Sequence, residues 1–281
     1  MPFTTVQGLR LYYDVHGHPR RADTPPLLLI AGLGFSTWCW FKQLPALAEH
    51  HQVIVFDNRG TGRSEKPRHP YSVTRMVEDT IGLLDALDVR RAHVLGTSLG
   101  GFVAQELAAR HPARVGRLVL CCTSYGGPRS VPMSWSALSA TLGWGSIDRT
   151  QAILRGLRIA TSQPYCDEHL DELVQIAEWR QSDPLSRADY FRQVMAGVRF
   201  DGLHQARTIA APTLVLHGTD DRVVPVANAR LLGAALPDAT VHLLDGAGHL
   251  VFIERAAQVN RMILDFLEAS AQPAYGQARS D

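Results

Sequence analysis

The sequence has 281 residues, of which 46% are hydrophobic and 20% are charged, a composition typical of a globular protein with one large core, or one core with an insertion. The formal net charge is +1, so electrostatics gives no reason to expect nucleic acid or an anionic membrane as a partner. The first residues lack a charged segment followed by an apolar stretch, and we therefore expect a cytoplasmic protein without a membrane segment.

The first 125 residues alternate between strand and helix patterns. Residues 9–15 alternate apolar and polar side chains, as an edge strand does. Ser72 begins a helical pattern as its N-cap, and another helical pattern runs from Leu99 to His111. Continuous apolar runs typical of buried parallel strands occur at residues 27–31, 53–56, 92–95 and 118–121. This order predicts an α/β fold, with a mostly parallel, doubly wound sheet flanked by helices.

The alternation stops after Tyr125 and resumes with a strand at Thr213. The residues between them carry helical signals only; Asp183 before Pro184, for example, reads as an N-cap and a first helical residue. We therefore expect three parts: a core of residues 1–125 and 208–270, an inserted helical cap of residues 126–207, and a flexible tail of residues 271–281.

The pentapeptide Gly96-Thr97-Ser98-Leu99-Gly100 joins a predicted strand to a predicted helix. Its small residues let the two elements approach closely, and the turn places Ser98 at a helix N-terminus, where free N–H groups favour negative charge. This context is that of a nucleophile elbow. From the motif alone, a glycine-rich connection with an incidental serine remains the alternative.

A serine hydroxyl becomes a nucleophile when a base takes its proton and an acid orients that base. Downstream of Ser98, the strand beginning at Thr213 leads to Asp220 and Asp221, and the next strand leads to His249. These candidates follow the carboxyl ends of strands, where open α/β sheets place their sites. The order serine, aspartate, histidine is the order expected along such a chain.

Four sequence blocks together resemble the α/β-hydrolase superfamily over about residues 9–268, specifically its bacterial single-domain members with a helical cap. Ile30-Ala31-Gly32-Leu33-Gly34 resembles the oxyanion loop, and residues 57–64 resemble the DxRGxGxS turn. The elbow at Ser98 and the GxxD…P block with GHxxxxE, which ends at Glu254, complete the set. Ala31 replaces the histidine that commonly precedes the oxyanion glycine, which puts the rigidity of this loop in doubt.

The resemblance implies a role for each matched residue. Ser98 would be the nucleophile, His249 the base and Asp221 the orienting acid, since the GxxD spacing favours Asp221 over Asp220. The backbone N–H groups of Leu33 and Leu99 would hold the oxyanion. Candidates for contacts with substrate are Gly32, Gly34, Leu250, Trp135, Trp144 and Trp179.

The expected cap holds Trp135, Trp144 and Trp179, three of the five tryptophans of the chain. An insertion between strands and next to a site predicts a lid over an apolar acyl pocket. The alternative is that these rings only pack the cap onto itself.

Patterns for other kinds of site are incomplete. Gly32 and Gly34 follow a strand as in a dinucleotide fingerprint, but Thr37 stands where the third glycine belongs. The four cysteines match no zinc spacing and no HExxH motif occurs, so we expect no metal and no cofactor. We expect His51 on a surface turn, and His217 either behind the catalytic residues as a partner of one of them or in a structural role.

The sequence thus predicts a serine hydrolase that cleaves small carboxylic esters or lactones through an acyl-enzyme. The Gly248-His249-Leu250…Glu254 block resembles that of the enol-lactonase and esterase branches. C–C-bond hydrolases resemble the chain too, but they usually carry a tryptophan after the catalytic histidine, where Leu250 stands here. A perhydrolase, an acyltransferase and a ligand receptor that has kept the triad remain alternatives. The natural substrate and the oligomeric state are not predicted.

Overall fold

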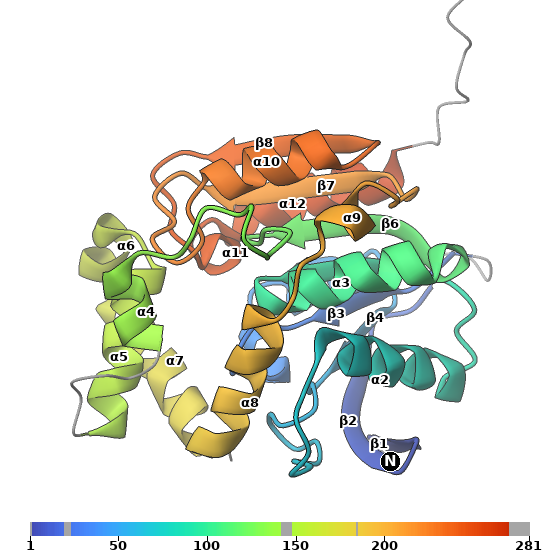
Figure 1. Ribbon diagram of the computed structural model, residues 1–281, viewed down its shortest axis with the longest axis horizontal. Coiled ribbons are helices and arrows are strands. Elements are labelled where there is room, and N and C mark those ends of the chain that lie inside the picture. The colour runs from blue at the N-terminus through green and yellow to red at the C-terminus, as the bar shows by residue number, and fades with distance from the viewer. Residues whose placement is uncertain (1, 20–23, 142–147, 184, 270–281) are drawn as a thin grey trace, which may run out of the picture.

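The computed structural model describes residues 2–19, 24–141, 148–183 and 185–269. Its centre is an eight-stranded sheet with the order β1-β2-β4-β3-β5-β6-β7-β8, shown in Figure 1. The strands are β1 (Phe3–Val6), β2 (Leu9–His16), β3 (Leu27–Ile30), β4 (Val53–Phe56), β5 (Ala92–Thr97), β6 (Val115–Cys121), β7 (Thr213–Gly218) and β8 (Ala239–Leu244). β2 pairs antiparallel with β1 and β4, and all other pairs are parallel. The predicted α/β-hydrolase fold is confirmed.

Helices cover both faces of the sheet (Figure 1). In the core part of the chain these are α1 (Leu44–Ala48), α2 (Val73–Ala86), α3 (Leu99–Arg110), α10 (Ala227–Ala235), α11 (Val251–Glu254) and α12 (Ala256–Glu268), with 3₁₀ turns η1 (Thr37–Trp40) and η2 (Pro112–Arg114). Strand β3 explains why the predicted runs lack alternation. Leu28 and Ile30 belong to the hydrophobic cluster under α2 and α3, whereas Leu27 and Leu29 belong to the cluster on the opposite face, so every residue of the strand is buried.

The segment between β6 and β7 is helical. It contains α4 (Trp135–Thr141), α5 (Arg149–Ala160), α6 (Gln163–Glu168), α7 (Leu170–Ser182), α8 (Arg187–Val198) and α9 (Leu203–Ala206). Figure 1 shows α4 to α7 gathered beside the sheet, with α8 leading back towards α3. The use of this segment as a lid stays a prediction, and the tail at residues 271–281 lies outside the described residues.

Three local expectations were wrong or incomplete. Asp183 is the C-cap of α7 rather than an N-cap, because α7 continues to Ser182 and Ser186 caps α8 instead by accepting from the N–H of Asp189. His51 is buried rather than on a surface turn, since its ring packs against that of His93. The strand β1 has no counterpart in the sequence analysis.

No helix in the described ranges is long and apolar enough to cross a membrane. The four cysteines are buried and free.

Candidate active site

Ser98 occupies the sharp turn between β5 and α3. Its backbone angles are φ 51° and ψ −117°, a region that L-residues other than glycine rarely adopt. The neighbouring glycines make the turn possible. A Cβ at Gly96 would lie 2.4 Å from the carbonyl oxygen of Gly100, and a Cβ at Gly100 would lie 2.1 Å from that of Ile30. Any larger residue at either position would therefore push the helix away from the sheet.

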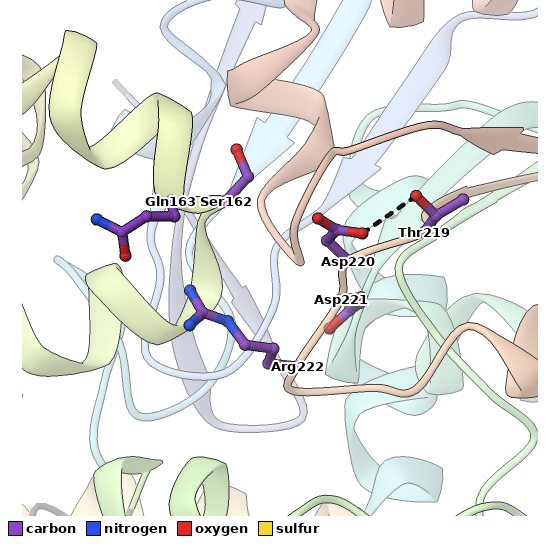
Figure 2. Close-up of a pocket in the computed structure, with 6 residues that line it drawn as sticks. All are labelled: Ser162, Gln163, Thr219, Asp220, Asp221 and Arg222. Atoms are coloured by element: carbon purple, nitrogen blue, oxygen red, sulfur yellow. Dashed lines mark hydrogen bonds between the residues drawn. The ribbon is translucent and has the colours of Figure 1, made fainter.

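The structure brings Ser98, His249 and Asp221 together from three different loops. His249 Nε2 lies 3.2 Å from the Ser98 hydroxyl oxygen, and His249 Nδ1 lies 2.8 Å from Asp221 Oδ2. Both His249 and Asp221 are buried. Asp220 takes a different direction, since its carboxylate accepts from the Thr219 hydroxyl at 3.4 Å (Figure 2). Of the two adjacent aspartates, Asp221 is the one that reaches the imidazole.

The Asp221 carboxylate is held in its ionised form. The N–H groups of Val223 and Val224 donate to its Oδ1 at 2.8 and 2.7 Å, and His217 Nε2 lies 3.0 Å from its Oδ2. Burial by itself raises the pKa of Asp221, but His249 and His217 outweigh it and lower the pKa to about 2. A fixed negative charge therefore faces His249 at neutral pH. His217 is a partner of this acid, which is one of the two roles expected of it.

The loop after β3, which carries Leu33, lies directly against the turn of Ser98. A Cβ at Gly32 would lie 3.2 Å from Ser98 Cβ. The loop forms a turn in which the N–H of Phe35 donates to the carbonyl of Gly32 at 3.2 Å. Leu99 follows Ser98 as the first residue of α3. The roles of Leu33 and Leu99 as oxyanion donors stay predictions.

The residues expected to contact substrate lie in different environments. Trp179 packs its ring 6.0 Å from that of Trp38 and 5.1 Å from that of Phe41, so it joins α7 to the core instead of packing the helical segment only onto itself. Trp135 is 70% exposed and therefore forms no part of a closed pocket wall in this conformation. Leu250 is buried, with its N–H donating to the carbonyl of Ala160. Trp144 lies outside the described residues.

Gly34, another of these candidates, is enclosed by two residues of the helical segment. A Cβ at this position would lie 2.9 Å from Tyr190 Cε2 and 3.0 Å from Arg180 Nη2. Close packing around its backbone, rather than an open binding surface, surrounds this glycine.

Two side chains that no catalytic motif assigns connect the site to the helical segment. Glu254 Oε1 accepts from the N–H groups of Gly248 and Ser162, at 3.0 and 3.2 Å. Arg222 donates from Nη2 to the carbonyls of Arg158 and Thr161, at 2.6 and 2.7 Å. The loops of His249 and Asp221 are thus both attached to the junction of α5 and α6. Glu254 stands at a matched position of the GHxxxxE block, whereas Arg222 stands at an unmatched position inside the GxxD…P block.

A cavity of about 340 Å³ lies beside this junction. Figure 2 shows the polar side chains that line it, which include Ser162, Asp221 and Arg222. Neither Ser98 nor His249 lines it, so it is not the space next to the serine hydroxyl. Within the described ranges, no group of three or more histidine, cysteine, aspartate or glutamate side chains could hold a metal ion.

Comparison with known proteins identifies the family of the chain. The model of the alpha/beta hydrolase family matches residues 27–262. The chain belongs to this family.

Individual relatives cover nearly the whole chain. A poly(3-hydroxyalkanoate) depolymerase of Ectopseudomonas oleovorans is 32% identical over 91% of this chain and 89% of its own length. A putative carbamate hydrolase of Variovorax paradoxus is 34% identical, over 94% of this chain and 98% of its own. Among solved structures, the enol-lactonase from Burkholderia xenovorans superposes with a TM-score of 0.85 at 28% identity, over 95% of this chain and 100% of that one. The names of these proteins give different substrates, and together they support hydrolase activity in general for this chain.

Proposed function

We propose that this chain is a serine hydrolase that cleaves carboxylic esters or lactones of small molecules, without a cofactor. The observation that carries the proposal is the pair of contacts at His249, 3.2 Å to the Ser98 hydroxyl and 2.8 Å to the Asp221 carboxylate. One ring nitrogen faces the nucleophile and the other faces a fixed negative charge. The imidazole can therefore accept the serine proton while the carboxylate stabilises the resulting cation.

The reaction follows from these positions. Ser98 Oγ attacks the substrate carbonyl carbon while its proton passes to His249 Nε2. The carbonyl oxygen becomes an oxyanion that the N–H groups of Leu33 and Leu99 stabilise. His249 then returns the proton to the leaving alkoxide, which departs from an ester and stays attached to the acyl chain in a lactone. Water activated by His249 releases the acid and restores Ser98.

The test is covalent labelling together with turnover. A fluorophosphonate should label Ser98 alone, and Ser98→Ala should lose the label and nearly all hydrolysis of a short chromogenic ester. The expected loss in kcat is up to about 10⁶-fold. Ser182→Ala changes an exposed serine at the end of α7 and serves as the matched control, which should label and turn over normally. Substantial hydrolysis by Ser98→Ala would refute the mechanism.

Carbamate hydrolysis is a second candidate, favoured by the relative of that name at 34% identity. The same three side chains could attack a carbamate carbonyl, because its carbon is also an acyl centre. A panel of esters, lactones, carbamates and C–C cleavage substrates, compared by kcat/KM on the purified protein, decides among these bonds. A protein that is labelled at Ser98 but turns over none of them would fit the receptor alternative.

A further inference from the structure

Gln193 on α8 joins two loops next to the proposed site. Its side chain is 1% exposed. Its Oε1 accepts from the N–H of Gly34 at 3.0 Å, and its Nε2 donates to the carbonyl of Arg59 at 3.0 Å. Both ends of one buried amide are therefore used, and they bind the backbone of the loop after β3 and of the loop after β4.

The bond to Gly34 fixes the turn that carries Leu33. The N–H of Phe35 donates to the carbonyl of Gly32, so residues 32–35 form a tight turn with Gly34 at its third position. Gly34 has a φ of +68°, and type II turns require a positive φ at this position. The peptide between Leu33 and Gly34 is the central peptide of such a turn. Gln193 Oε1 accepts from the N–H of this peptide, which belongs to Gly34. The Gln193 side chain therefore orients Leu33, whose own N–H is the proposed oxyanion donor.

Other contacts make α8 the support of this region. Tyr190, one turn before Gln193, packs against Gly34. One turn after it, a Cβ at Gly197 would lie 3.4 Å from Leu99 Cδ1. The same face of α8 therefore meets the segments of both proposed oxyanion donors. A second amide, Asn58 Nδ2, donates to the carbonyl of Ala31 at 3.1 Å and holds the start of the loop, where the family's histidine is missing.

We propose that Gln193 is a positioning residue that holds the Leu33 N–H in place for the oxyanion, so that the oxyanion hole is complete only while α8 is seated on the core. The proposal rests on the proposed serine-hydrolase function. Gln193 touches no reacting atom, and its effect passes through the turn of Gly34. Loss of its bonds should lower transition-state stabilisation more than it lowers substrate binding.

The experiment compares three variants of the full chain. Gln193→Met keeps the size of the side chain and removes both bonds. Gln193→Glu keeps an acceptor for Gly34 but, when ionised, cannot donate to Arg59. The matched control is Asn228→Leu, because Asn228 is also a buried amide that uses both ends, bonding the N–H and the carbonyl of Val131 at 2.8 and 2.9 Å. It anchors the start of the helical segment to α10 and not to the oxyanion loop.

Four quantities are measured for each variant: kcat and KM on a short chromogenic ester, the inhibition constant of a trifluoromethyl ketone, and hydrogen exchange of the Gly34 amide. Ser98 Oγ adds to the ketone carbonyl, its proton passes to His249, and the former carbonyl oxygen becomes an oxyanion. This inhibitor therefore reports on the oxyanion hole, whereas hydrogen exchange reports on the turn without any catalysis.

We expect Gln193→Met to lower kcat and ketone affinity by about 10- to 100-fold, less than the 10²- to 10³-fold of removing a donor outright, with KM changed less than threefold. Its Gly34 amide should exchange faster. Gln193→Glu should lose more thermal stability than Gln193→Met, because it buries a charge. It should nevertheless retain a higher kcat than Gln193→Met, and its Gly34 amide should still exchange slowly. Asn228→Leu should lose stability but neither ketone affinity nor Gly34 protection.

The inference would be overturned if Gln193→Met kept the kcat and ketone affinity of the wild type. It would also be overturned if Asn228→Leu lost as much kcat and ketone affinity as Gln193→Met, because Gln193 would then have only a general structural role. If Gln193→Met does not fold, Gln193→Glu decides: loss of ketone affinity with Gly34 still protected would overturn it. A wild-type protein that neither labels nor turns over would refute the proposed function instead. Even then, unchanged exchange of the Gly34 amide in Gln193→Met would separately refute the role of Gln193 in holding this turn.

Discussion

Asp220 and Asp221 are neighbours in the chain, yet the structure gives them opposite environments. Asp221 is 6% exposed and bonds His249, while the side chain of Asp220 is exposed and bonds Thr219. Asp221→Asn should lower kcat by about 10⁴-fold, because an amide facing Nδ1 favours the wrong imidazole tautomer. Asp220→Asn should change kcat by less than about threefold. Steady-state kinetics of the two variants measures the difference, and a reversed order would exclude Asp221 as the orienting acid.

His93 gives the stability of the fold a pH dependence that is separate from catalysis. Its Nδ1 accepts from the N–H of Arg117 at 3.0 Å, which requires a neutral ring. Burial, and next the nearby His51, lower the pKa of His93 from 6.5 to about 4. Between these two values the unfolded chain binds a proton that the folded protein excludes. The free energy of unfolding should therefore fall as the pH drops from about 6.5 to 4, by at most about 1.4 kcal/mol per unit.

Urea denaturation at several pH values measures this slope. His93→Gln removes the titrating ring and should flatten the dependence over that range. His69→Gln changes an exposed histidine in the loop before α2 and should leave it as it is. A slope that is the same in wild type and His93→Gln would mean that another group is responsible.

Which of these residues could be predicted depends on how far their signal extends along the chain. Ser98 and His249 stand in short motifs whose glycines serve local geometry, so the sequence predicts their positions. Asp221 needed the family's spacing to be preferred over Asp220. Gln193 carries no such signal, because its partners Gly34 and Arg59 lie 159 and 134 residues away and become neighbours only in the folded protein.

At the scale of elements, the approach of α3 to the sheet depends on Gly100. Its missing side chain leaves room for the carbonyl of Ile30, which a Cβ would meet at 2.1 Å. Gly100→Ala should destabilise the fold by about 1–3 kcal/mol through overpacking, and it should also lower kcat, because the shift displaces Ser98 relative to the loop after β3.

Gly156 provides the matched control for this substitution. It lies within α5, and a Cβ there would meet no atom within 4 Å. Gly156→Ala should therefore stabilise the fold by up to about 1 kcal/mol, since alanine is the better helix former. Thermal denaturation of both variants gives the comparison. Equal effects of the two substitutions would mean that the approach of α3 to β3 tolerates a methyl group.

The elements themselves were predictable where their pattern was long or fully apolar, as in β3 and α2. The predicted N-cap of α2 is confirmed, since the Ser72 side chain accepts from the N–H of Arg75 at 3.2 Å. Strand β1 was missed because it is only four residues long and pairs only with β2. The turn between them has positive φ at Gln7 and Gly8, as a tight hairpin requires. Gly8 is therefore the residue whose presence in the sequence points to this hairpin.

At the scale of the whole molecule, two of the attachments between the helical segment and the core lie at the loops of the proposed site. Gln193 and Tyr190 hold α8 to the loop after β3, and Glu254 with Arg222 holds the junction of α5 and α6 to the loops of His249 and Asp221. The segment that should recognise substrate is therefore attached to each part of the proposed catalytic machinery. Composition and periodicity predict that such a segment exists, but not where it is attached.

The two described tryptophans of this segment should differ in what they contribute. Trp179 packs between Trp38 and Phe41, so Trp179→Ala should lower the free energy of unfolding, by up to about 3 kcal/mol. Trp135 is 70% exposed, and Trp135→Ala should leave stability nearly unchanged.

If the Trp135 indole covers the acyl chain when substrate binds, each added CH₂ contributes up to about 0.8 kcal/mol, a factor of about four in kcat/KM. Wild type should therefore show kcat/KM rising from acetate towards octanoate, and Trp135→Ala should flatten the rise while preserving acetate turnover. A series that is flat in wild type, or equally steep in both proteins, would mean that α4 does not contact the acyl chain.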